Sequence, residues 1–193
     1  MNAYILAGGF SRRMGRDKTL LFFKGKPLIV YLYRFVSQFF PTYVVAKDTE
    51  KYLKLGIEKV ISDLFVQIQS PAVGIYTGLK HSPYRFNLFL SADLPFLSQN
   101  YLKFLKDYRF EEKFLGFIPI LEEKKHYTCG VYSRKLIPLL EDAIEKVELS
   151  LKRYEKYFHF WEEDFLKKYG IHPECCFNLN TPRELEFLKI NEV

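Results

Sequence analysis

Short apolar runs alternate with amphipathic stretches along the first half of the chain. Residues 3–7 form an apolar run that ends at a double glycine, which is typical of a buried parallel strand. Pro27 then stands at a favourable first helical position, and apolar side chains recur at helical spacing from Leu28 to Phe39. This pattern predicts a strand, a loop and a helix, in that order.

The same alternation continues to about residue 108. The predicted strands and helices are, in chain order, 42–46, 48–55, 59–61, 73–81, 86–92 and 98–105. Asp48, Thr49 and Ser98 have side chains that can cap the helices that follow them. Repeated strand–helix units imply a parallel sheet that is covered by helices on both faces.

The pattern changes after residue 108. Two strand-like runs, 114–121 and 126–132, flank the charged turn 122–125. Two such runs joined by a short polar turn favour an antiparallel hairpin. We therefore expect a mixed sheet.

The last third of the chain gives a less uniform signal. A helix is expected near 135–143, whereas 148–170 alternates charged and aromatic residues without a single period and supports no assignment. Near the end, Thr181 offers an N-cap, Pro182 a first helical position and Glu184 the reciprocal acid of a capping box. These residues predict a final helix.

Length and composition limit the range of functions. The 193 residues fit one domain, 1–193, and a hydrophobic share of 48% with a charged share of 27% is that of an ordinary globular chain. The net charge of +6 suggests anionic ligands, but the basic residues alternate with acids except between Arg12 and Lys18. No basic stripe or binding motif indicates nucleic acid as a partner.

Cysteine usage and hydrophobicity indicate a cytoplasmic protein. Cys129, Cys175 and Cys176 form no C-x-x-C pair, and a disulfide between the two adjacent residues would be strained, so we expect a reducing compartment. The apolar run near the start of the chain, residues 4–7, is followed by glycines and is too short for a signal peptide. The apolar stretch 28–40 is interrupted by polar side chains, so we expect no membrane span.

The strongest chemical signal directly follows the first strand. Three glycines and four cations occur in the eleven positions from Gly8 to Lys18. Glycines let backbone N–H groups approach an anion, and cations neutralise its charge, so a triphosphate is the natural ligand. The spacing matches neither a Walker loop nor a dinucleotide-binding fingerprint. A glycine turn with solvated basic residues is the alternative, and the density of cations argues against it.

Carboxylates at two strand ends supply the second signal. Asp93 follows the strand 86–92 at the edge where open α/β sheets bind ligands, which makes it a candidate metal ligand. Its alternative role is to cap the turn into Pro95. Asp63 ends another apolar run and could face the same crevice, or be an exposed loop acid. The histidines have no metal-ligand spacing, and no nucleophile–base pair supports covalent catalysis.

The opening loop and the segments 91–96 and 178–182 together resemble the bacterial molybdenum cofactor guanylyltransferase family, in order and spacing from Leu6 to Leu185. The resemblance implies an α/β fold with three α/β/α layers, of the Rossmann-like, glycosyltransferase-A-like nucleotidyltransferase type, with a mostly parallel mixed sheet. It implies Mg²⁺-dependent transfer of GMP from GTP to molybdopterin, giving molybdopterin guanine dinucleotide and pyrophosphate. Other molybdenum cofactor biosynthesis proteins and recipient molybdoenzymes are the protein partners it implies.

Residue roles follow from the resemblance position by position. Asp93 would hold Mg²⁺, and Lys18 with Arg13 would stabilise charge moving onto pyrophosphate, so these three are the implied catalytic residues. The implied nucleotide-binding residues are Leu6, Ala7, Gly8, Gly9, Lys18, Asp63 and Asp93.

The acceptor would contact Asn178 and Asn180, although Asn180 could instead order the entry to the last helix. The nucleotide-binding part would then span about 1–108 and the acceptor-binding part about 109–193.

The chain also departs from the family pattern. Many members carry a nucleotide-reading asparagine where this chain has Ala46 and Lys47. Ser70 replaces a family glycine, and the basic candidates for the pterin region are Lys152, Arg153 and His126. A related nucleotidyltransferase that uses CTP or another phosphorylated acceptor stays open as an alternative. The second alternative is a nucleotide-binding module that catalyses no reaction, and the presence of Asp93 and Lys18 argues against this alternative.

Overall fold

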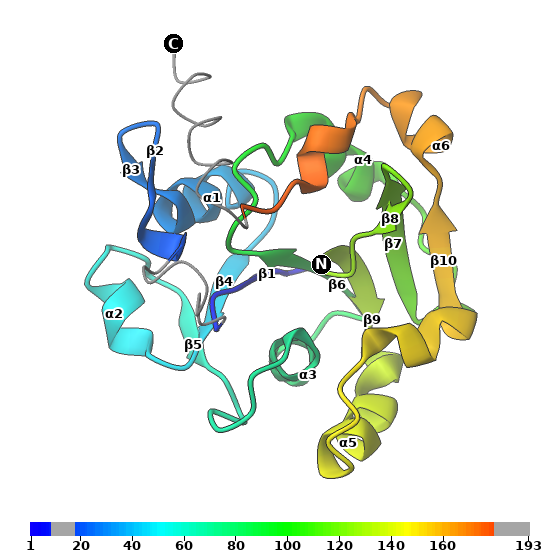
Figure 1. Ribbon diagram of the computed structural model, residues 1–193, viewed down its shortest axis with the longest axis horizontal. Coiled ribbons are helices and arrows are strands. Elements are labelled where there is room, and N and C mark those ends of the chain that lie inside the picture. Colours follow the sequence, from blue (N-terminus) through cyan, green and yellow to red (C-terminus); the bar gives the residue numbers. More distant parts are fainter. Residues whose placement is uncertain (9–17, 180–193) are drawn as a thin grey trace.

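Residues 1–8 and 18–179 are described by the computed structural model. Their main element is an eight-stranded sheet with the order β10-β7-β9-β6-β1-β4-β5, in which β8 pairs with β7 (Figure 1). Its strands are β1 (Ala3–Leu6), β4 (Thr42–Ala46), β5 (Val60–Ser62), β6 (Phe86–Ser91), β7 (Gly116–Leu121), β8 (Lys124–Lys125), β9 (Cys129–Ser133) and β10 (Phe158–Trp161). The short strands β2 (Phe22–Phe23) and β3 (Lys26–Pro27) form a separate antiparallel hairpin.

The sheet is mixed and mostly parallel, as predicted. β1 runs parallel to both β4 and β6, and β4 runs parallel to β5. β9 is antiparallel to its neighbours β6 and β7, which confirms the predicted hairpin, and β10 is parallel to β7. The carboxyl ends of β1, β4, β5 and β6 therefore meet at one edge of the sheet.

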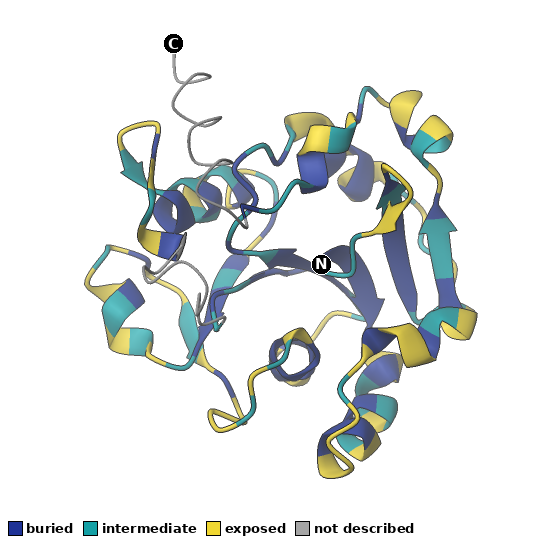
Figure 2. Ribbon diagram, viewed as in Figure 1, coloured by how far each residue is buried: buried dark blue, intermediate teal, exposed yellow. Residues whose placement is uncertain are grey.

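Helices cover both faces of the sheet, which confirms the three α/β/α layers. Figure 1 shows α1 and α4 on one side and α3 and α5 on the other, and Figure 2 shows the buried strands between them. The helices are α1 (Leu28–Val36), α2 (Thr49–Leu53), α3 (Pro71–His81), α4 (Gln99–Asp107), α5 (Ile137–Glu145) and α6 (Glu163–Lys167). The 3₁₀ turns are η1 (Lys18–Leu20), η2 (Arg134–Leu136), η3 (Leu151–Tyr157) and η4 (Pro173–Cys176).

Two clusters of buried side chains hold the layers together. α1 contributes Leu28 and Leu32 to one cluster, and α3 contributes Ile75 and Leu79 to the other. Each pair is spaced so that both side chains project from the same helical face toward the sheet. None of the helices in the described ranges is both long and apolar enough to cross a membrane.

Local chemistry shifts the ends of two predicted helices. α1 ends at Val36 rather than Phe39, because the N–H groups of Gln38 and Phe39 donate three residues back, to the carbonyls of Phe35 and Val36, and the chain leaves the helix through tighter turns. α3 begins at Pro71 rather than Val73. The hydroxyl of Ser70 caps the helix by accepting a hydrogen bond from the N–H of Ala72, and the proline fits the first helical position.

The second half also differs in detail from the sequence pattern. β9 begins at Cys129 rather than at residue 126, because the N–H of Cys129 donates to the carbonyl of His126 and closes a turn there. The unassigned stretch 148–170 contains η3, β10 and α6. The predicted final helix beginning near Thr181 lies outside the described residues.

Close packing of α3 on the sheet gives a stability prediction. A Cβ added at Gly78 would lie 2.6 Å from Cε1 of Phe89 and 2.9 Å from Cγ of Tyr4, two rings that stack with centroids 5.2 Å apart. We expect Gly78→Ala to lower the free energy of unfolding by about 1–3 kcal/mol despite the better helix propensity of alanine. Urea denaturation measures this difference.

Gly74→Ala is the matched comparison for this prediction. Its added Cβ would lie 2.9 Å from Cδ2 of Leu6, the movable end of a flexible side chain, so the loss of stability should be smaller. A Gly78→Ala protein as stable as the wild type would contradict the packing described here.

Candidate functional site

A cavity of about 220 Å³ lies at the carboxyl ends of the parallel strands. Side chains and backbone from all four strand ends line it, and α3 closes one side. Among its lining residues are Leu6, Gly8, Lys47, Asp63, Ser70 and Ser91. Parallel strands thus gather residues that are far apart in the sequence at the edge where the sequence predicted a ligand.

Asp63 is held at this edge by α3. Its side chain is buried at 7% exposure, and its Oδ1 accepts a hydrogen bond of 2.9 Å from Oγ1 of Thr77. The same Thr77 oxygen accepts the N–H of Leu64 at 3.1 Å, which fixes the hydroxyl. A Cβ placed on Gly8 would lie 3.8 Å from Oδ2 of Asp63. Asp63 is therefore not an exposed loop acid, and its second oxygen faces the beginning of the glycine-rich segment.

The loop after β1 is described at its two ends. Ala7 is buried, and its N–H donates to the carbonyl of Val45 at 2.9 Å, which extends the β1–β4 ladder by one residue. Lys18 begins η1, and its side chain is not described. The predicted site residues Gly9 and Arg13 lie outside the described residues.

Asp93 follows the end of β6 and is half-buried. The hydroxyl of Ser91 donates to its Oδ1. Its backbone carbonyl accepts the N–H of Leu179 at 3.0 Å, which brings Asn178 next to this strand end. Asn180, the other predicted acceptor residue, lies outside the described residues. The next helix, α4, is capped by Ser98 rather than by Asp93.

The donor set around Asp93 fits a hard divalent cation that is shared with a substrate. Within residues 1–8 and 18–179, no group of three or more His, Cys, Asp or Glu side chains could hold a metal ion by itself. Mg²⁺ is commonly held by one or two carboxylates together with substrate phosphates rather than by a complete protein cage. A single carboxylate, oriented by a serine hydroxyl at a strand end, is consistent with that mode.

A larger cavity of about 830 Å³ lies in the second half of the chain, beside β8, η3 and η4. Lys152, His126 and Asn178 line it, whereas Arg153 pairs with Glu148 instead. Burial lowers the pKa of His126, so this imidazole is neutral at pH 7 and contributes hydrogen bonding rather than charge.

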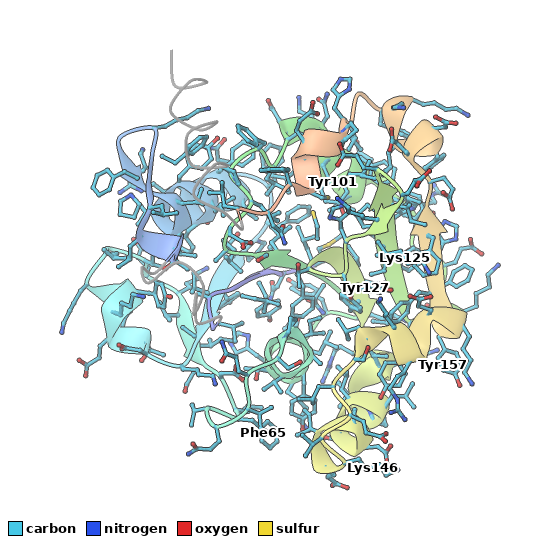
Figure 3. The ribbon with its side chains drawn as sticks, viewed as in Figure 1. Phe65, Tyr101, Lys125, Tyr127, Lys146 and Tyr157 are labelled. Atoms are coloured by element: carbon cyan, nitrogen blue, oxygen red, sulfur yellow. The ribbon has the colours of Figure 1, made fainter. Side chains whose placement is uncertain are left out.

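A network of three polar side chains forms one wall of this second cavity. Nζ of Lys125 lies 2.6 Å from Oε2 of Glu155, and the hydroxyl of Tyr127 donates to the other oxygen of the same carboxylate. Burial, assisted by Glu155, raises the pKa of Tyr127, so the phenol stays protonated. Lys125 and Tyr127 are labelled in Figure 3. Sequence periodicity gave no signal for this network, because its members come from β8, the turn after it and η3.

The three cysteines are free and buried. Cys175 accepts a hydrogen bond of 3.6 Å from the hydroxyl of Ser98, the residue that caps α4. Cys129 at the start of β9 belongs to the same core cluster as Cys175 and Cys176.

Comparison with known proteins assigns the family. The MobA-like NTP transferase domain matches residues 3–156. A probable molybdenum cofactor guanylyltransferase of Aquifex aeolicus is 35% identical over 190 residues, which cover 97% of this chain and 83% of that protein. A similar protein of Flavobacterium johnsoniae, which carries the same description, is 35% identical over 78% of each chain.

Solved structures agree with this assignment. The molybdopterin-guanine dinucleotide biosynthesis protein A of Archaeoglobus fulgidus superposes with a TM-score of 0.83 at 25% identity, over 98% of this chain and 97% of that one. A CMP:2-keto-3-deoxy-manno-octonic acid synthetase in complex with CTP shares the fold with a TM-score of 0.70 at 15% identity, over 98% of this chain and 96% of that one. The chain belongs to the family of MobA-like NTP transferases.

Proposed function

We propose that the protein is a molybdenum cofactor guanylyltransferase, which transfers GMP from GTP to molybdopterin and releases pyrophosphate. One observation carries the proposal: Gly8, Asp63 and Ser91 line the same cavity at the carboxyl edge of the sheet. Asp93 follows the end of β6 at this edge. These residues belong to a chain that is 35% identical, over 97% of its length, to a probable enzyme of this kind.

We propose Mg²⁺ as the divalent metal, held by Asp93 together with the triphosphate. When bound, Mg²⁺ supplies positive charge that neutralises the phosphate oxygens during transfer. Ser91 donates to the carboxylate of Asp93 and orients it at the strand end.

The proposed reaction is a direct displacement. An oxygen of the molybdopterin phosphate forms a bond to the α-phosphorus of GTP, and the bond from that phosphorus to the bridging oxygen breaks. The electron pair leaves with pyrophosphate, and Lys18 and Arg13 would stabilise its charge. A phosphate is already anionic, so no general base is needed.

The two cavities support separate binding sites for the nucleotide and the acceptor in the two halves of the chain. We propose that about 1–108 binds the nucleotide and about 109–193 binds the acceptor, with Asn178 between them. Residues from the second half dominate the larger cavity, and Asn178 is one of them. A cytoplasmic location is part of the proposal and agrees with three free thiols.

Two neighbouring strand ends offer a basis for guanine preference. The N–H of Asp63 donates to the carbonyl of Ala46 at 2.9 Å, so Lys47 and Asp63 follow paired positions and both line the smaller cavity. Guanine presents the acceptor O6 and the donor N2–H₂, which match a cationic donor beside a carboxylate acceptor. Adenine presents a donor amino group where guanine has O6. We propose that Lys47 takes part in reading the base.

Thermal stabilisation by nucleotides tests the proposal. With Mg²⁺ present, GTP should raise the melting temperature more than equal concentrations of CTP, ATP or UTP, because selective binding to the native state stabilises it. A wrong base would leave polar groups unpaired at a cost of about 1–3 kcal/mol for each group. Equal stabilisation by all four nucleotides would remove the guanylyl assignment. Stronger stabilisation by CTP would favour the related enzyme that uses CTP.

A further inference from the structure

A single buried hydroxyl connects the two described ends of the glycine-rich segment. Tyr52 is the buried residue of α2, with 3% of its surface exposed. Its hydroxyl donates to the backbone carbonyl of Ala7 at 3.1 Å. The Oγ1 of Thr19 lies 3.4 Å from the same hydroxyl. Because the phenol has one proton and Ala7 accepts it, Thr19 donates in the second contact.

The two hydrogen-bond partners of Tyr52, Ala7 and Thr19, flank the glycine-rich segment. Ala7 precedes Gly8 and is held from the other side by the Val45 carbonyl. Thr19 follows Lys18 in η1 and is buried at 6% exposure. The hydroxyl therefore joins the end of β1 to the start of η1, across the segment that carries the glycines and cations.

Lys51 adds a third contact to this hydroxyl. Its Nζ lies 3.5 Å from the oxygen of Tyr52 and 4.9 Å from the centroid of the ring. The ammonium donates to this oxygen and polarises its O–H bond, which strengthens the hydrogen bond to the Ala7 carbonyl. The tyrosine is thus fixed by its buried ring as well as by its hydroxyl.

We propose that Tyr52 is a positioning residue for the triphosphate, because its hydroxyl sets the separation of Ala7 and Thr19. The inference rests on the proposed function only in taking the segment between them as a phosphate-binding loop. Fixing both ends of a loop lowers the conformational entropy that ligand binding must still remove. The loss of the hydroxyl should therefore weaken phosphate binding without removing any group that touches the ligand.

Tyr52→Phe tests this proposal, because the ring stays and only the hydroxyl is removed. Calorimetric titration of GTP with Mg²⁺, and of inorganic tripolyphosphate with Mg²⁺, should show affinities about 5- to 30-fold weaker than those of the wild type, which is what the loss of one or two hydrogen bonds gives. The titrations are made well below the melting temperature, so that every variant is folded.

Tyr154→Phe is the matched control. The hydroxyl of Tyr154 also donates to a backbone carbonyl, that of Leu139, at 2.9 Å, but on the α5 side of the sheet. The Tyr154→Phe protein should bind GTP and tripolyphosphate with affinities within twofold of those of the wild type. If Tyr154→Phe weakens binding as much as Tyr52→Phe, or if Tyr52→Phe binds like the wild type, the positioning role is wrong.

Thr19→Val provides a second route to the same answer, including the case in which Tyr52→Phe does not fold. It removes the other half of the bridge and should also weaken tripolyphosphate binding, and the double variant should lose little more than Tyr52→Phe alone. Fully additive losses would overturn the bridge. A wild-type protein that binds tripolyphosphate but not GTP would contradict the proposed function, while the comparison of variants with tripolyphosphate would still decide the role of Tyr52.

Discussion

Asp93→Asn should lower the rate of pyrophosphate release from GTP and molybdopterin by about a thousandfold, while the protein stays folded. The amide keeps the shape of the side chain and removes the negative charge that would hold Mg²⁺. A metal that neutralises phosphate charge in the transition state contributes several kcal/mol, and a thousandfold loss of rate is about 4 kcal/mol. Single-turnover kinetics at saturating Mg²⁺ measure the loss, and circular dichroism checks the fold.

Asp142→Asn is the control for this experiment. Asp142 is exposed on α5, where it pairs with Lys146 at 2.6 Å, and its substitution should leave the rate unchanged. Asp93→Asn protein that is folded and retains more than a tenth of the wild-type rate would show that the metal is held elsewhere.

Lys18→Ala should lower kcat/KM for GTP by about a hundredfold, with both weaker binding and a slower rate. The lost charge would face the phosphates in the ground state and in the transition state alike, so KM should rise and kcat should fall together. Hydrogen bonds to charged groups contribute about 1.5–3 kcal/mol, which corresponds to this range.

Lys54→Ala is the comparison for Lys18→Ala. The side chain of Lys54 is 79% exposed just after α2 and pairs with Glu50, so its removal changes the net charge equally without affecting turnover. If the two variants behave alike, the effect of Lys18 is one of overall charge, and the assignment of the glycine-rich segment is wrong.

The first half of the fold could be predicted because each of its elements has a local signal. Short apolar runs mark β1, β4, β5 and β6, and helical spacing marks α1 and α4. Parallel strands of this kind bring their carboxyl ends together, so Gly8 and Asp63 could be expected at one edge from the sequence alone.

Elements whose stability depends on distant partners could not be predicted in this way. β10 is a strand because Phe158–Trp161 pairs with Gly116–Pro119 of β7, about forty positions earlier, whereas its own sequence has no clean period. The side chains that hold the site residues in place also depend on contacts between distant parts of the chain. Thr77 reaches Asp63 from α3, and Tyr52 reaches Ala7 from α2, through side-chain contacts that no spacing rule describes.

The most direct test of the central claim is the product formed by the purified protein with Mg²⁺, molybdopterin and an equimolar mixture of GTP and CTP. The proposed function predicts that pyrophosphate is released in step with a single new species, whose mass is that of molybdopterin plus one GMP unit. The Asp93→Asn protein should give neither product. A product that carries CMP, or no pyrophosphate from the folded wild-type protein, would contradict guanylyl transfer.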